Sequence, residues 1–283
     1  MHLIHMNELK GPATGMMVVE APYVAKHRRA GQFIILRIDE QGERIPLTIV
    51  DSDIESGTIT LYYQIVGKST SKMSQLKAGE YLQDIAGPLG HPTDVKLYGT
   101  VVCVGGGIGI APVYPISLAM KKAGNRVINI IGARTDELLI LEDELRDAGD
   151  ELIVCTDDGS SGKKAFVTEA LKEIMDSEQV DLVVAIGPVP MMKAVSDVTR
   201  EDGIKTFVSL NSIMVDGTGM CGGCRVSVNN EKRFTCVDGP EFDGHQVNFD
   251  ELITRLGTYR DEEKISMEKY QHTCQLEGVE KNG

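Results

Sequence analysis

The 283-residue sequence lacks long apolar runs. None approaches 18 residues, and the longest, such as 101–104 and 182–186, have the length of β-strands. We therefore expect no membrane-spanning helix. Residues 1–6 contain neither a basic segment nor a long apolar segment, so no signal peptide is expected and the predicted localisation is cytoplasmic.

Positive charge is also scarce, because 42 acidic residues outweigh 29 Lys and Arg and leave a net charge of −13. This balance argues against a nucleic acid partner, because contacts with phosphates depend on Lys and Arg. The six His are scattered with no H-E-x-x-H motif, and no G-x-S-x-G nucleophile elbow is present. The two hydrolase classes that use these motifs are therefore not expected.

The first third of the chain has the composition of β-structure. Segments rich in Val, Ile, Thr and Tyr are separated by turn-forming residues such as Lys10-Gly11-Pro12. Several short strands at this spacing predict an antiparallel β-barrel or sandwich over residues 1–97. The expected strands are 16–20, 32–38, 45–50 and 58–66.

From residue 98 the pattern changes to apolar strands that alternate with helix-like segments. This alternation predicts a parallel, doubly wound α/β domain over residues 98–212. A cluster domain over 213–250 and a polar helical tail over 251–283 are expected to follow, the tail either packing on a partner or lying in solvent. The expected strands are 100–104, 126–131, 152–155, 182–186 and 205–208, and the expected helices are 111–123, 137–148, 167–175 and 191–201.

Cysteine is sparse, but three of the six Cys lie close together at C-x2-C-x11-C. Asp216 precedes Cys221 by the four-residue gap at which a plant-type [2Fe–2S] site has its leading Cys. We interpret Asp216, Cys221, Cys224 and Cys236 as ligands of such a cluster. A zinc site and unligated thiols remain as alternatives, although the loop has no His, and Asp216 could instead be a turn residue.

A glycine-rich segment over 104–112 joins a predicted strand to a predicted helix. It fits Gly107-x-Gly109-x-x-Pro112 rather than a simple G-x-G-x-x-G. Glycine lets the backbone approach a pyrophosphate at a helix N-terminus, and Pro is tolerated in the first helical turn. The segment predicts a nucleotide site, with a tight turn that binds no ligand as the alternative.

These features together resemble the ferredoxin–NADP reductase superfamily over essentially the whole chain. Within it, the sequence resembles the electron-transfer subunits of dihydroorotate dehydrogenase. It resembles more closely the small subunits of NADH-dependent reduced ferredoxin:NADP oxidoreductase, also known as the sulfide dehydrogenase type. The segments that carry the resemblance are 44–49, 64–70, 87–90, 105–112, 132–134, 187–191 and the cluster loop.

The resemblance implies that FAD binds to the barrel domain. The usual Arg is displaced, because Ile45 stands in its place when Thr48 takes the Ser position, and Arg44 is one residue early. A one-residue shift on a strand turns a side chain to the other face, so Arg44 either reaches the FAD phosphate by another route or is a surface charge. The implied FAD-binding residues are Arg44, Pro46, Leu47, Thr48, Gln64, Ile65, Val66, Gly67, Ser69, Thr70, Gly87 and Pro88.

The resemblance also implies that a nicotinamide nucleotide binds to the α/β domain. Arg134 is expected to meet the adenosine ribose or a 2′-phosphate, with a surface Arg as the alternative. Asp157 and Asp158 would repel an additional phosphate, which favours NADH over NADPH. The implied residues are Gly107, Gly109, Pro112, Gly132, Arg134, Asp157, Asp158, Gly187, Pro188 and Met191.

The function that follows is electron transfer, and hydride transfer itself needs no acid or base residue. The resemblance implies that hydride is exchanged between NADH and FAD, and that electrons pass through the cluster to a larger flavin and [4Fe–4S] subunit. The implied complex couples NADH and reduced ferredoxin to NADP reduction by electron bifurcation, with ferredoxin an indirect partner. Alternatives are a dihydroorotate dehydrogenase subunit, whose motif begins with Cys where this chain has Asp216, a sulfide dehydrogenase subunit, and a regulatory flavin-binding subunit without turnover.

Overall fold

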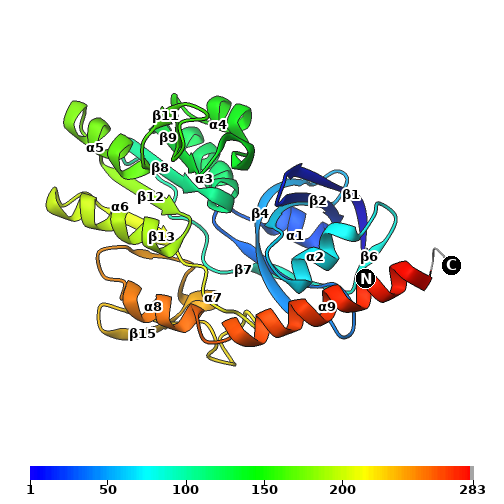
Figure 1. Ribbon diagram of the computed structural model, residues 1–283. Coiled ribbons are helices and arrows are strands. Elements are labelled where there is room, and N and C mark those ends of the chain that lie inside the picture. The colour runs from blue at the N-terminus through cyan, green and yellow to red at the C-terminus, as the bar shows by residue number, and fades with distance from the viewer. Residues whose placement is uncertain (281–283) are drawn as a thin grey trace.

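The computed structural model describes the backbone of residues 1–280 and the side chains of residues 1–272. An antiparallel sheet formed by the N-terminal region lies beside a parallel sheet flanked by helices (Figure 1). A small third region adjoins the parallel sheet, and a long C-terminal helix leads from it to the N-terminal sheet. Among the described residues, no helix combines the length and apolarity that a membrane span requires.

The first sheet has seven strands in the order β6-β1-β2-β5-β4-β3-β7, all paired antiparallel, so the predicted antiparallel fold is confirmed. Strands β1, β6 and β7 and the two short helices were not predicted. Ile4 is the one buried residue of β1, so this strand lacks the apolar alternation of its neighbours. The elements are β1 (His2–Gly11), β2 (Thr14–Glu20), α1 (Pro22–His27), β3 (Phe33–Arg37), β4 (Arg44–Asp53), β5 (Thr58–Gln64), α2 (Lys68–Gln75), β6 (Tyr81–Leu82) and β7 (Asp84–Leu89).

Strand β3 is buried on both faces, and the two faces belong to different cores. Ile34 and Leu36 point into the core of the antiparallel sheet. Phe33 and Ile35 alternate with them and pack in a separate cluster that includes cysteines of the third region. The outer face of β3 is therefore the contact between the N-terminal sheet and the predicted cluster loop.

The second sheet has the order β11-β10-β9-β8-β12-β13-β16 and is parallel except for β16 at its edge. The predicted parallel α/β architecture is confirmed, and β12 has the predicted bounds. Its strands are β8 (Thr100–Gly106), β9 (Arg126–Ala133), β10 (Glu151–Thr156), β11 (Lys163–Lys164), β12 (Leu182–Ile186), β13 (Thr206–Ser209) and β16 (Glu241–Asp243).

Helices cover both faces of this sheet. Along β8, Val101 and Cys103 pack with α3 on one face, while Val102 and Val104 pack with α5 and α6 on the other. This is why the strand is apolar at every position rather than at alternate ones. The helices are α3 (Ile110–Lys122), α4 (Glu142–Ala148), α5 (Val167–Ser177) and α6 (Val189–Glu201), and one-turn 3-10 helices lie at η1 (Gly107–Gly109) and η2 (Asp136–Leu138).

The prediction of one continuous helix over 137–148 was wrong. The helix is divided into η2 and α4, and Leu141 between them has a left-handed backbone with φ of 56°. Ile140 is buried in the core of the α/β domain. Burial of this residue holds the connecting segment against the sheet, which a helical periodicity does not reveal.

The third region contains a hairpin and short helices. Strand β16 pairs with β13, so the segment predicted as a separate cluster domain also supplies an edge strand to the α/β sheet. Helix α9 runs from this region along α2, where the Tyr270 hydroxyl donates to Gln75 Oε1 at 3.1 Å (Figure 1). The elements are β14 (Arg225–Val228), β15 (Glu231–Phe234), α7 (Thr235–Asp238), α8 (Phe249–Leu256) and α9 (Arg260–Glu280).

Candidate functional site

The parallel sheet reverses its strand order at β8. Strands β9 and β10 follow on one side of it, and β12 and β13 follow on the other. Open parallel sheets bind ligands beyond the carboxyl ends of the strands at such a reversal. The glycine loop leaves β8 here, and the 187–191 segment leaves β12, so the topology brings two predicted nucleotide segments together.

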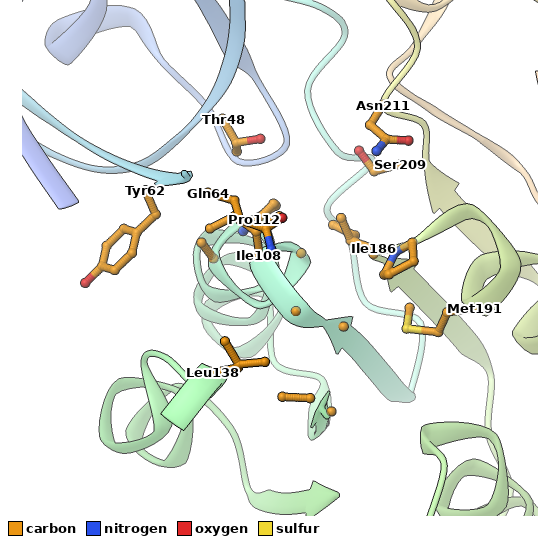
Figure 2. A pocket seen from close by; sticks show the side chains of 18 of the residues that line it. Thr48, Tyr62, Gln64, Ile108, Pro112, Leu138, Ile186, Met191, Ser209 and Asn211 are labelled. Carbon is orange, nitrogen blue, oxygen red and sulfur yellow. The ribbon is translucent and has the colours of Figure 1, made fainter. Parts of the chain in front are cut away.

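A cleft of about 720 Å³ opens at this reversal, a volume typical of a cofactor or ligand site. Its lining comes from all three regions. In Figure 2, Thr48 and Gln64 of the N-terminal sheet lie across from Ser209 and Asn211, and Pro112 at the start of α3 is drawn below Thr48. The cleft therefore joins the two predicted nucleotide-binding domains in one continuous space.

The glycine loop forms the floor of the cleft at the N-terminus of α3. Gly107 has φ of +55°, and a Cβ built there would have no heavy atom within 4 Å, so its backbone is open to a ligand. Gly109 has no such open space, because a Cβ there would collide with the backbone of Ile186. Pro112 lies in the first turn of α3, whose N-terminal dipole favours an anionic group in the cleft.

Strand β4 forms the opposite wall. Its pairing with β3 sets Ile45 opposite Leu36 and Thr48 opposite Phe33. Ile45 packs on the inner core, whereas Pro46 and Thr48 line the cleft. Arg44 is exposed and, by the two-residue period of a strand, lies on the face of Pro46 and Thr48, although it is outside the cleft lining. The displaced Arg thus keeps the face on which a FAD contact is possible.

Thirteen of the predicted nucleotide-binding residues line the cleft and nine do not. Those that line it are Pro46, Leu47, Thr48, Gln64, Gly107, Gly109, Pro112, Gly132, Arg134, Asp157, Gly187, Pro188 and Met191. Those outside its lining are Arg44, Ile65, Val66, Gly67, Ser69, Thr70, Gly87, Pro88 and Asp158, and their predicted contacts stay predictions.

The outlying residues 65–70 lead into α2 and include its first turn. The Thr70 hydroxyl oxygen accepts hydrogen bonds from the backbone N–H groups of Val66 at 3.1 Å and Gly67 at 3.2 Å. The Ser69 hydroxyl donates to the Glu43 carboxylate at 2.5 Å. These contacts hold the helix N-terminus in place beside the β4 wall.

Several cleft residues were missed by the sequence reasoning. Ser209 is the last residue of β13, Asn211 and Met214 come from the connection between β13 and the cluster loop, and Pro240 precedes β16. Their signal was the position just after a predicted parallel strand, where this fold places ligand contacts. Residue type alone did not mark them, because none of them belongs to a glycine-rich or charged motif.

The far end of the cleft contains Arg134 and Asp157, which follow β9 and β10. Asp158 is turned into its own loop, where its carboxylate accepts the Ser160 N–H at 2.9 Å and the Ser160 hydroxyl at 2.6 Å. The Ser160 hydroxyl and then the Ser160 backbone N–H lower the pKa of Asp158, so this carboxylate is charged at neutral pH. Asp157 is thus the acidic residue of the pair placed to meet a nucleotide.

The β14–β15 hairpin brings two predicted cluster ligands together. Cys224 precedes β14, Cys236 follows β15, and the Thr235 N–H donates to the Cys224 carbonyl at 3.1 Å. The two sulfur atoms lie 3.2 Å apart and both residues are buried. Burial and then the Cys224 sulfur raise the pKa of the Cys236 thiol to about 12, and the charge of a bound metal would offset this cost of forming the Cys236 thiolate.

Asp216 and Cys221 form a second pair in the same loop, in which Cys221 is exposed and Asp216 is half-buried. The Asp216 carboxylate accepts the backbone N–H of Cys221 at 2.7 Å and that of Thr218 at 2.8 Å. The Gly223 N–H points to the Cys221 sulfur at 3.4 Å, as a loop that solvates thiolate and sulfide requires. A carboxylate has about four lone-pair sites, so these two hydrogen bonds leave Asp216 able to bind a metal.

The ligands thus lie in two pairs rather than around one point. Within the described part of the chain, no three His, Cys, Asp or Glu side chains converge as the ligands of a single ion would. A tetrahedral zinc site needs all four ligands on one centre. Two iron atoms bridged by sulfide take two protein ligands each, so the paired arrangement fits a [2Fe–2S] cluster better than zinc.

Comparison with known proteins assigns the same regions. Residues 211–248 match the iron–sulfur cluster binding domain of dihydroorotate dehydrogenase B, and residues 103–197 match the oxidoreductase NAD-binding domain. A dihydroorotate dehydrogenase B (NAD(+)) electron transfer subunit homolog of Thermotoga maritima is 48% identical over 90% of each chain. The chain belongs to the family of dihydroorotate dehydrogenase B electron transfer subunits and their homologues.

Two further similar proteins have lower sequence identity to this chain. The electron transfer subunit of dihydroorotate dehydrogenase B (NAD(+)) from Fusobacterium nucleatum is 34% identical over 81% of this chain and 90% of its own. A solved structure of NADH-dependent reduced ferredoxin-NADP oxidoreductase, described in connection with flavin-based electron bifurcation, matches with a TM-score of 0.92. It is 43% identical and covers 96% of this chain and 98% of that one.

In this chain, an ionisable group lies at the contact between the cluster region and the N-terminal region. The buried Thr93 hydroxyl donates to the Glu241 carboxyl of β16. Burial raises the pKa of Glu241 to about 7, opposed by the Thr93 hydrogen bond and assisted by Asp94. The carboxyl is therefore held in its neutral form to a higher pH than in the unfolded chain.

The raised pKa of Glu241 predicts that the free energy of unfolding depends on pH. A raised folded-state pKa means that the contribution of Glu241 is greatest below its unfolded pKa of 4.5 and is lost as the pH rises through about 7. Between these pH values the free energy of unfolding of the wild type should fall by up to about 3 kcal/mol on account of Glu241. In Glu241→Gln this fall should be absent. Urea unfolding at pH 5 and pH 8 measures it, with the exposed Glu231→Gln as the control. An equal pH dependence in wild type and Glu241→Gln would contradict the prediction.

Proposed function

We propose that this chain is the NADH- and FAD-binding, iron–sulfur electron-transfer subunit of an NADH-dependent reduced ferredoxin:NADP oxidoreductase. The observation that carries the proposal is the single cleft, whose walls are the predicted flavin wall of β4 and the predicted nucleotide loop of β8. Two redox-active rings must meet at close range for hydride transfer, and one shared cleft allows this. Bound flavin supplies the conversion between two-electron hydride transfer and one-electron transfer.

The residues of the cleft divide between the two nucleotides. Pro46, Leu47 and Thr48 are assigned to one face of the flavin ring, with Arg44 and residues 64–70 toward its phosphates. Gly107 and the α3 N-terminus are assigned to the pyrophosphate of the nicotinamide nucleotide. Asp157 lines the end of the cleft where an adenosine 2′-phosphate would lie, so its charge favours NADH.

The four predicted ligands are assigned in their observed pairs. Cys224 and Cys236 would hold one iron in the buried part of the loop, and Asp216 and Cys221 would hold the other at the surface. The matched iron–sulfur domain at 211–248 and the paired geometry support this assignment. Asp216 at the leading position is also the feature that favours this type of complex over a dihydroorotate dehydrogenase.

The chain acts as a subunit of an electron-transfer complex. Its proposed partner is a larger subunit that carries flavin and [4Fe–4S] clusters, and the complex would couple NADH and reduced ferredoxin to NADP reduction. The 43% identical solved structure supports this partner, whereas the 48% identical Thermotoga maritima relative keeps the dihydroorotate dehydrogenase partner as the second candidate. Isolation of the native complex and identification of its larger subunit distinguishes the two.

NADH is expected to reduce the flavin of the purified chain without any partner. Anaerobic titration should bleach the visible flavin absorbance, because both proposed nucleotide sites belong to this chain and meet at its cleft. The same titration with NADPH should require a higher concentration. A protein that retains FAD yet shows no bleaching with either nucleotide would contradict the enzymatic function and favour a regulatory subunit.

A further inference from the structure

The cleft and the buried cysteine pair share two side chains. Phe33 and Met214 both line the cleft. Both also belong to the apolar cluster that contains Cys224 and Cys236, with Ile35 as its fifth buried member. Phe33 and Met214 are 4% and 6% exposed, so the space between the cleft and these sulfurs is filled by apolar side chains rather than water.

Two elements distant in sequence build this contact. Phe33 projects from the outer face of β3, directly opposite Thr48 of the flavin wall. Met214 comes from the connection that leaves β13 and enters the cluster loop. The loop is seated on the same β3 face, because a Cβ at Gly217 would lie 2.7 Å from both Ile35 and Leu89. Tight packing of this kind excludes water from the contact.

The other half of the loop has the opposite environment. Cys221 is exposed, Asp216 is half-buried, and the neighbouring Met220 is 87% exposed. The two proposed iron positions therefore differ in solvation: one lies behind an apolar wall beside the cleft, and the other lies in water. Solvent exposure is one of the factors that set the reduction potential of an iron–sulfur cluster.

We propose that Phe33 and Met214 are positioning residues that form a water-excluding wall between the flavin end of the cleft and the Cys224–Cys236 side of the cluster. This inference rests on the proposed function. The wall keeps the reduction potential of the cluster low, because reduction adds a negative charge that a dry, apolar surrounding solvates poorly. One electron crosses at a time, so the flavin side is oxidised by one electron, the iron is reduced by one, and no bond forms or breaks.

The test places a polar group in the wall. In Met214→Gln, water and the amide stabilise the reduced cluster, so its midpoint potential in an EPR-monitored titration is expected to shift to a more positive value. Pulsed EPR of the reduced cluster in D2O should show a stronger deuterium coupling. Met214→Leu restores an apolar wall and should keep the wild-type potential. Met220→Gln is the matched control, because Met220 already lies in water.

Each outcome decides the inference. The inference is wrong if the midpoint potential of the cluster in Met214→Gln equals that of the wild type. It is also wrong if Met220→Gln shifts this potential by the same amount. If Met214→Gln fails to retain iron, Phe33→Tyr introduces a hydroxyl at the same wall with little change of shape, and it must shift the potential in the same direction. A wild-type protein without any [2Fe–2S] signal would instead contradict the proposed function.

Discussion

Replacement of Cys236 by serine is expected to abolish the [2Fe–2S] signal of the dithionite-reduced protein. Cys236 is buried with its sulfur 3.2 Å from that of Cys224, so the two are placed to bind the same iron. A serine hydroxyl is a harder and less acidic ligand than a thiol, and its C–O bond is shorter than the C–S bond of cysteine. Iron and acid-labile sulfide content, together with EPR, measure the loss.

Cys103→Ser provides the matched control, because Cys103 is equally buried but lies in β8, in a core that contains none of the proposed ligands. Burial raises the pKa of the Cys103 thiol to about 12, as it does for Cys236, but among the described residues no second cysteine lies in the core around Cys103. This variant should lose some stability and keep the cluster. Retention of a normal cluster in Cys236→Ser would remove Cys236 from the ligand set.

Gly107→Ala is expected to weaken NADH binding at least tenfold while the protein remains folded. The φ of +55° makes alanine less favourable than glycine by about 1 kcal/mol, which a domain of this size tolerates. The added methyl would occupy open space on the cleft side, where the backbone must approach the pyrophosphate. Stopped-flow reduction of the flavin over a range of NADH concentrations gives the apparent dissociation constant.

Gly203→Ala separates the backbone effect from the binding effect. Gly203 has φ of +65°, a Cβ there would also have no heavy atom within 4 Å, and the residue is outside the cleft lining. Both variants should therefore lose a similar free energy of unfolding, and Gly107→Ala alone should lose affinity for NADH. An equal loss of affinity in the two variants, or none in either, would show that the Gly107 backbone does not approach the nucleotide.

The parts of the fold that could be predicted are those whose burial is repeated along the chain. Strands β8 and β12 are apolar at nearly every position because helices cover both faces, and the sequence showed this directly. The glycine loop could be found because its backbone demands a particular residue type. The three clustered Cys could be found because a metal requires particular side chains at a particular spacing.

Other parts depended on contacts that no local pattern records. Strand β1 is held by pairing with β2 and β6 rather than by its own buried residues. Segment 137–148 is broken because Ile140 is buried against the sheet. Asn211 and Met214 reach the cleft because of where β13 ends, and their residue types are common in any loop.

The sequence by itself determined the types of domain and the candidate binding groups: an antiparallel domain, a parallel nucleotide domain, a glycine loop and a set of three thiols and one carboxylate. These follow from residue types and spacings, which are local properties. The tertiary structure decided how these parts are connected. It joined the two nucleotide regions in one cleft, divided the ligands into a buried pair and a pair nearer the surface, and placed Phe33 and Met214 between cleft and cysteines. Such contacts join residues as far apart as 33 and 236, and packing in three dimensions alone brings them together.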